Sequence, residues 1–151
     1  MQRGLQWLAH RWFLMTRAVT LGVRAVVLDG DGQVLLVKHT YTPGWHLPGG
    51  GVEVGETVHV ALGKELAEEA GVTLQGTSIL HGVFFNARIS RRDHVAVFVV
   101  RDFDWSGPPE PNREISAARF FPLAGLPQDT TEATRRRLAE VLDDAPVSAT
   151  W

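Results

Sequence analysis

The stretch GGVEVGETVHVALGKELAEEAGV, residues 50–72, decides how the rest of the chain is interpreted. From Thr57 onward it consists mostly of residues that favour helices, and Gly71 is a typical helix terminator, so we predict a helix between these two positions. The apolar side chains at helical spacing are Val58, Leu62 and Leu66. The sequence therefore predicts an amphipathic helix that packs one face on a core.

The same stretch is rich in acids, namely Glu56, Glu65, Glu68 and Glu69. At about 100° per residue, Glu69 points nearly in the direction of Leu62, and Glu65 lies at the edge of that face. Clustered carboxylates repel each other and resist ionisation unless a cation compensates them. Hard oxygen donors without Cys or His at ligand spacing indicate Mg²⁺, for which Mn²⁺ can substitute. The alternative is a solvated acidic face with Lys64 as its counter-charge.

The order and spacing of these residues resemble the Nudix box. That pattern is Gly, five residues, Glu, seven residues, Arg-Glu, an aliphatic residue, any residue, Glu-Glu, any residue, Gly and an aliphatic residue. The matching positions are Gly50, Glu56, Glu65, Leu66, Glu68, Glu69, Gly71 and Val72. Lys64 stands where the family has Arg, and because Lys cannot grip a carboxylate bidentately we expect a weakened but surviving activity.

The resemblance implies an α/β fold, a Nudix-type α/β/α sandwich with a mixed β-sheet. It also implies an enzyme, a Mg²⁺-dependent pyrophosphohydrolase that cleaves the diphosphate of a small nucleoside diphosphate derivative with activated water. The implied metal ligands are Glu65, Glu68, Glu69, a backbone carbonyl of Gly49 or Gly50, and an additional acid, Glu114 or secondarily Glu110. Either Glu65 or Glu69 would be the general base, and Glu56 would pair with Lys64.

Outside this stretch the sequence predicts strands and one further helix. The expected strands are 20–29, 33–39, 77–89, 94–103 and 114–123. The first two are expected to pair as one hairpin, and the next two as another. An amphipathic helix is expected at 130–144, with Thr130 or Thr131 as its cap. The chain then divides into an N-terminal amphipathic helix at 1–18, one Nudix domain at 19–145 and a flexible tail at 146–151.

The N-terminal segment contains three arginines and no acid, with an apolar stripe of Leu5, Leu8, Trp12 and Met15. Arg11 interrupts the apolar run, so the segment does not fit a signal peptide. We expect a helix that packs on its own domain or on a second copy in a homodimer. The alternatives left open are contact with a membrane surface, including work on lipid-linked diphosphates, and a disordered start.

Composition narrows the range of functions. A length of 151 residues fits one domain, and a net charge of −2 gives no basic field for a nucleic acid duplex. The absence of Cys excludes thiol catalysis, Cys-based zinc sites and disulfides, and is compatible with the cytoplasmic location that we expect. No apolar run approaches the ~20 residues that a bilayer requires, so we expect no stable membrane insertion.

Residues outside the box are expected to select the nucleotide. Trp45 and His46 could stack on a base, although a Trp in such a loop could equally cover the core. Asn86 and Arg88 are expected to share one face of a strand, which could line the cleft or simply face solvent. Arg92, in the turn that follows, could bind phosphates or simply belong to a charged turn.

The substrate class stays open at this stage. Residues 73–90 contain neither the Pro nor the Tyr that mark family members acting on ADP-ribose and on dinucleoside polyphosphates. That leaves nucleoside triphosphates or other small derivatives as the first expectation, with an ADP-ribose or nucleotide-sugar pyrophosphatase as the alternative. A catalytically weak module that senses nucleotides or binds a partner is the alternative from another class.

Overall fold

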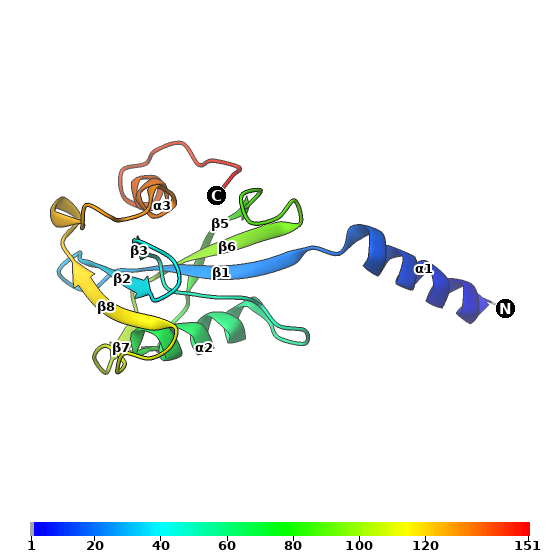
Figure 1. Ribbon diagram of the computed structural model, residues 1–151, viewed down its shortest axis with the longest axis horizontal. Helices are drawn as coiled ribbons and strands as arrows, with labels where there is room; N and C mark the ends of the chain where they lie inside the picture. Colours follow the sequence, from blue (N-terminus) through cyan, green and yellow to red (C-terminus); the bar gives the residue numbers. More distant parts are fainter. Residues whose placement is uncertain (1) are drawn as a thin grey trace.

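The computed structural model describes residues 2–151, with side chains from residue 10 onward. The body of the molecule has three layers, because α2 (Val58–Ala70) covers one side of the strands and α3 (Glu132–Leu142) covers the other (Figure 1). A short 3-10 turn, η1 (Leu123–Gly125), precedes α3. The predicted α/β/α sandwich is thereby confirmed.

The strands form one mixed sheet, one antiparallel sheet and one short pair. The mixed sheet has the order β1 (Thr20–Val27), β6 (Asp93–Val100) and β5 (Ile79–Phe85), with β1 parallel and β5 antiparallel to β6. The antiparallel sheet has the order β3 (Trp45–His46), β2 (Val34–His39) and β8 (Ile115–Phe121). The remaining pair is β4 (Val72–Leu74) with β7 (Phe103–Trp105). The mixed sheet carries Arg24 on β1, and the backbone of this strand also holds the loop that leads into α2.

Two apolar clusters, one on each side of the strands, hold the layers together. The cluster under α2 includes Val23, Ala25 and Val27 of β1 with Leu62 and Leu66 of the helix. The cluster under α3 includes Val26, Leu28, Phe84 and Leu138. The apolar run in β1 is nearly continuous because successive side chains point to opposite faces and both faces are covered.

Both predicted helix ends of the acidic stretch are confirmed. The Thr57 side chain accepts a hydrogen bond from the backbone N–H of Val60, which caps the start of α2. Gly71 adopts the left-handed conformation, with φ 67°, and ends the helix. In α3 the cap is Thr131, whose hydroxyl accepts from Thr134.

One predicted hairpin is confirmed and the other is wrong. β5 and β6 pair antiparallel from Ile79↔Val99 to Phe85↔His94, as expected for 77–89 and 94–103. β1 and β2, in contrast, do not pair as neighbouring strands, and the turn between them has only an isolated bridge between Leu28 and Val34. The reason is that β1 takes β6 as its parallel partner, so the chain passes at this turn from one sheet to the other.

The two ends of the chain also differ from expectation. Residues 146–151, predicted as a flexible tail, run beside β5, where Phe85 N–H donates to Ala149 O at 3.0 Å and Trp151 N–H donates to Phe85 O at 3.0 Å. α1 (Gln2–Arg17) extends away from the body (Figure 1). Trp12 and Met15 are 62% and 67% exposed, so the described part of the apolar stripe does not pack on the domain. The side chains of Leu5 and Leu8 lie outside the described residues, and no described helix is long and apolar enough to cross a membrane.

Candidate active site

The loop that leads into α2 is fixed along the free edge of β1. The backbone bonds run from Ala25 N–H to Pro48 O at 3.0 Å, from Val23 N–H to Gly50 O at 2.8 Å, and from Val52 N–H to Leu21 O at 2.8 Å. Gly49 has φ 139°, and a Cβ there would collide with the backbone of Val23 and Arg24. The sequence therefore needs glycine at this position to bring the loop against the strand.

The predicted helix carries the carboxylates, and these side chains differ in how deeply they are buried. Glu69 is 7% exposed and accepts the Gly49 N–H at 2.8 Å. Glu65 is half-buried, and its carboxylate lies directly against Gly50, where a Cβ would overlap it. Glu68 is exposed. The helix thus presents two carboxylates to the glycine loop and one to solvent.

A further carboxylate comes from Glu114, the residue directly before β8. Asn112 Oδ1 accepts from the N–H groups of Glu114 and Ile115 at 2.8 Å each, which fixes the backbone that carries Glu114. Glu114 faces the same two hollows as Glu65 and Glu69. Glu110, the second candidate in sequence, is exposed and lines neither hollow.

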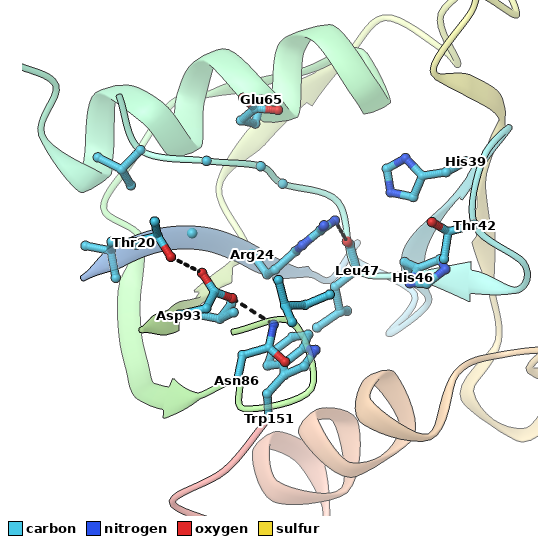
Figure 2. Close-up of a pocket in the computed structure, with 18 of the residues that line it drawn as sticks. Thr20, Arg24, His39, Thr42, His46, Leu47, Glu65, Asn86, Asp93 and Trp151 are labelled. Atoms are coloured by element: carbon cyan, nitrogen blue, oxygen red, sulfur yellow. Dashed lines mark hydrogen bonds between the residues drawn. The ribbon is translucent and has the colours of Figure 1, made fainter. Parts of the chain in front are cut away.

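These residues line a large cleft of about 930 Å³, with a smaller hollow of about 370 Å³ beside it. Figure 2 shows Glu65 beneath α2, and Arg24 of β1 extends across the middle of the cleft, where its Nη1 donates to Leu47 O at 2.8 Å. The volume is within the range of about 300–1,000 Å³ that small-molecule sites occupy. The cleft therefore has space for a nucleotide, with acids on one wall and a fixed guanidinium in its middle.

Burial changes the acid–base properties of this wall. It raises the pKa of Glu69 to about 7, although the Gly49 N–H and Arg24 oppose the shift. It also raises the pKa of Glu65, with the charge of Glu68 adding to the effect. Burial and then Arg24 lower the pKa of His39 to about 4. His39 Nδ1 lies 3.6 Å from Glu69 Oε1, but burial disfavours the charged form of both groups, so this contact is not a strong ion pair.

The donor set fits a hard divalent cation. Glu65, Glu69 and Glu114 supply carboxylate oxygens to one hollow, and Glu68 joins them in the smaller one. Such an oxygen-only set is the kind that Mg²⁺ prefers. Among the side chains that the structure describes, no three acids or histidines are already close enough together to hold a metal ion. The Gly50 carbonyl already accepts from Val23, and Gly49 is the other candidate for a backbone ligand.

The Lys at the Arg position of the box still meets its partner. Lys64 Nζ lies 3.7 Å from Glu56 Oε1 and 3.9 Å from Glu53 Oε1. The charges of Glu56 and Glu53 raise the pKa of Lys64. Glu56 in turn accepts the Glu53 N–H at 3.1 Å, so the lysine braces the loop before α2.

The residues predicted to select the nucleotide separate into two groups. His46 and Asn86 line the cleft. Trp45 does not, because it is buried with its ring edge-on to Phe121 at 4.8 Å, which is the covering role considered as its alternative. Arg88 and Arg92 are exposed in the turn after β5 and are not part of the cleft lining.

The expectation that Asn86 and Arg88 share a strand face is wrong. β5 ends at Phe85, and the Asn86 N–H donates to Asp93 O at 2.9 Å, which closes the turn to β6. Asn86 is consequently buried beside Asp93, whereas Arg88 lies in the turn at the surface.

Among the cleft residues that sequence reasoning missed, Arg24 and Trp151 bear most on the chemistry of the site. A charged residue inside the apolar run of β1 is the signal that could have identified Arg24, because such a charge is rarely buried without a purpose. Trp151 carries no comparable signal, since its place depends on how the last residues dock on β5 and α3.

The Nudix domain family model matches residues 19–142. The chain belongs to the Nudix family. It is 35% identical over 111 residues to an ADP-ribose pyrophosphatase of Methanocaldococcus jannaschii, a match that covers 69% of this chain and 65% of that protein, so the chain spans less than two thirds of this relative.

Two solved Nudix structures resemble the chain in fold and in sequence. A MutT Nudix hydrolase of Burkholderia pseudomallei shares 32% identity and a TM-score of 0.69, over 81% of this chain and 97% of that one. An ADP-ribose pyrophosphatase of Streptococcus suis shares 27% identity and a TM-score of 0.61, over 87% and 96%. The relatives of this Nudix protein thus carry more than one functional name.

Proposed function

We propose that this Nudix protein is a divalent-metal-dependent pyrophosphohydrolase that cleaves the diphosphate of a small nucleoside diphosphate derivative. The observation that carries the proposal is the placement of Glu65, Glu69 and Glu114 on one wall of a nucleotide-sized cleft that Arg24 crosses. Family membership and the names of the relatives support the reaction class.

The side chains have separable tasks in this proposal. Glu65, Glu68, Glu69 and Glu114 would hold Mg²⁺, with Gly49 offering a carbonyl, and Mn²⁺ would substitute. Bound Mg²⁺ supplies the charge that neutralises a diphosphate and polarises water for attack on phosphorus. Arg24 would bind a phosphate oxygen, since its guanidinium is held in the cleft by Leu47 O.

The proton of the attacking water goes to Glu69 or Glu65, the two carboxylates with the least exposure on this wall. Glu69 and Glu65 both lie next to the glycine loop, and both have raised pKa values. A base with a pKa near the working pH is suited to this transfer. Because the two groups interact, the pH profile of the reaction belongs to the pair.

The first substrate class is the nucleoside triphosphates and similarly small derivatives. ADP-ribose is the second candidate, and it is favoured by the pyrophosphatases of Methanocaldococcus jannaschii and Streptococcus suis that the chain resembles. Nucleotide sugars have the same chemistry at the diphosphate and belong in the same panel.

The experiment is phosphate or pyrophosphate release from a panel of nucleoside triphosphates, ADP-ribose, nucleotide sugars and dinucleoside polyphosphates. Wild type is compared with Glu69→Gln, and with Glu132→Gln, an exposed acid on α3, as the matched control. We expect turnover that requires Mg²⁺, stops in EDTA, collapses in Glu69→Gln and is retained in Glu132→Gln. Nucleotide binding without turnover on any substrate would contradict the proposal and indicate a sensing module.

A further inference from the structure

One end of the cleft contains side chains that the hydrolysis does not use. In Figure 2, Asn86 and Trp151 lie near α3 and the last residues of the chain, on the other side of Arg24 from Glu65. The two are brought together by β5, because Asn86 directly follows this strand and the segment that ends with Trp151 pairs with Phe85 at its end. The cleft therefore has an acidic end and a second end with an amide and an indole side chain.

Trp151 is held in place by contacts on two sides. Its backbone N–H donates to Phe85 O at 3.0 Å, and Arg136 Nη2 donates to Trp151 O at 2.6 Å. Its ring packs edge-on to Phe84 at 6.3 Å. The indole is half-buried, so part of its surface remains open to the cleft that it lines.

The segment that carries Trp151 is itself tied to α3 through a buried ion pair. Arg137 is fully buried, its guanidinium lies 3.8 Å from the Phe84 ring, and its Nη1 donates to Thr150 O at 3.2 Å. Glu140 accepts from Arg137 at 2.6 Å and from the Ser148 N–H at 2.9 Å. A buried pair with these extra hydrogen bonds fixes the segment, so the position of the indole is set before a ligand arrives.

Beside the indole lies a polar edge of fixed orientation. Asn86 is buried, and its Nδ2 donates to Asp93 Oδ2 at 2.8 Å, while Asp93 Oδ1 accepts from Thr20 at 2.7 Å. The bond to Asp93 determines which end of the Asn86 amide is the donor. Its carbonyl oxygen consequently remains available as an acceptor next to the ring.

The other aromatic residues of the cleft are placed differently. Tyr41 packs on His39 at 5.1 Å, and His39 lies 3.6 Å from Glu69, so the Tyr41 ring is on the side of the acidic wall. His46 lies edge-on to His39 at 5.4 Å, and Trp45 is buried in the core. Trp151 is therefore the large aromatic side chain of the described cleft that stands apart from the carboxylates.

We propose that Trp151 is the platform on which the base of the nucleotide stacks, with Asn86 reading the edge of that base. The inference rests on the proposed function, because it takes the diphosphate to lie at the acidic wall and Arg24. An aromatic face accepts any base, whereas an amide carbonyl favours a base that presents an N–H donor. The last segment of the chain thus contributes to substrate recognition.

The experiment compares Trp151→Ala and Trp151→Phe with wild type and with Trp12→Ala, which removes an exposed indole from α1 outside the cleft. KM is measured for the nucleotides that are turned over. Inorganic tripolyphosphate, which has no base, is the comparison: its KM is measured if it is a substrate, and its inhibition constant if it only competes with the nucleotide. In parallel, AMP, GMP, CMP and UMP are titrated in EDTA while tryptophan fluorescence is recorded.

We expect Trp151→Ala to raise KM for nucleotides by about tenfold to a hundredfold, the factor that loss of one stacked base carries. Tripolyphosphate should bind equally well to all variants, and Trp151→Phe should restore most of the affinity. At least one monophosphate should quench wild type and Trp12→Ala but not Trp151→Phe. An unchanged KM for nucleotides, or an equal rise for nucleotides and tripolyphosphate, would overturn the proposal.

The same design separates failure of the subsite from failure of the proposed function. If wild type hydrolyses no substrate, the proposed function is wrong and the titration alone decides. Quenching that depends on Trp151 then still supports the base platform, and its absence in wild type overturns it.

Discussion

Ionised Glu69 should lower the stability of the metal-free protein, although the proposed reaction needs this carboxylate. Its carboxylate is 7% exposed and has a pKa raised to about 7, because burial disfavours the charge. Glu69→Gln removes that charge but keeps an oxygen that can accept the Gly49 N–H, which now bonds to Glu69 at 2.8 Å. We therefore expect the variant to be more stable than wild type in EDTA at alkaline pH and to lose turnover.

The magnitude follows from the two pKa values. An acid whose pKa is higher in the folded than in the unfolded chain binds more protons when folded, so stability falls as pH rises between the two values. With 4.5 for the unfolded chain and about 7 for the fold, ionised Glu69 costs about 3 kcal/mol at pH 8 and less than about 1 kcal/mol at pH 5.

Urea unfolding of both proteins at pH 5 and pH 8, in EDTA, measures this difference directly. His39, whose pKa is lowered, adds a pH dependence of opposite sign, but it is present in both proteins and largely cancels. Glu68→Gln is the control, because this neighbour on α2 is exposed and its loss should change stability little. The reasoning is refuted if the gain in Glu69→Gln is the same at both pH values.

The other predictions concern the glycine loop, the lysine of the box and the arginine of the cleft. In urea unfolding, Gly49→Ala should lower the free energy of unfolding by about 2 kcal/mol or more, because the φ of 139° and the backbone of Val23 exclude a Cβ. Gly51→Ala is the control and should be nearly neutral, because a Cβ at Gly51 meets open space. Lys64→Arg should raise kcat a few-fold in steady-state assays, since a guanidinium can form two hydrogen bonds to the Glu56 carboxylate. An unchanged or lower kcat would show that this contact does not support catalysis. Arg24→Gln should raise KM at least about tenfold for every diphosphate substrate, while turnover stays sensitive to EDTA. A rise in KM only for substrates with one particular base would argue against contact between Arg24 and the phosphates.

The sequence predicts the parts of the molecule that depend on local spacing. The turn chemistry of Thr57 and Gly71 predicts both ends of α2, and the 3.6-residue period predicts that Glu69 is buried. The box spacing is specific enough to identify the family, which the match over residues 19–142 confirms. These features need only a few neighbouring residues to be recognised.

The features that sequence missed depend on contacts between distant segments. β1 pairs with β6 and not with β2, although β2 follows it directly in the sequence. This pairing depends on a strand about 70 residues away, so no local sequence pattern predicts it. Likewise, the last six residues look like a flexible tail until their hydrogen bonds to Phe85 and Glu140 are known. Trp45 and Trp151 have similar chemistry in the sequence, and only the fold shows that the first is in the core and the second in the cleft.

The attachment of the 48–52 loop to β1 makes the two halves of the cleft structurally independent. Because loop and strand share three backbone hydrogen bonds and leave no room for a Cβ at Gly49, a change on this side disturbs the acids and Arg24 together. The residues that end at Trp151 are held by β5 and α3, through Phe85, Arg136 and Arg137, and not by the 48–52 loop. Evolution can therefore exchange the group recognised at that end without rebuilding the chemistry, and directed evolution of new specificities should start there.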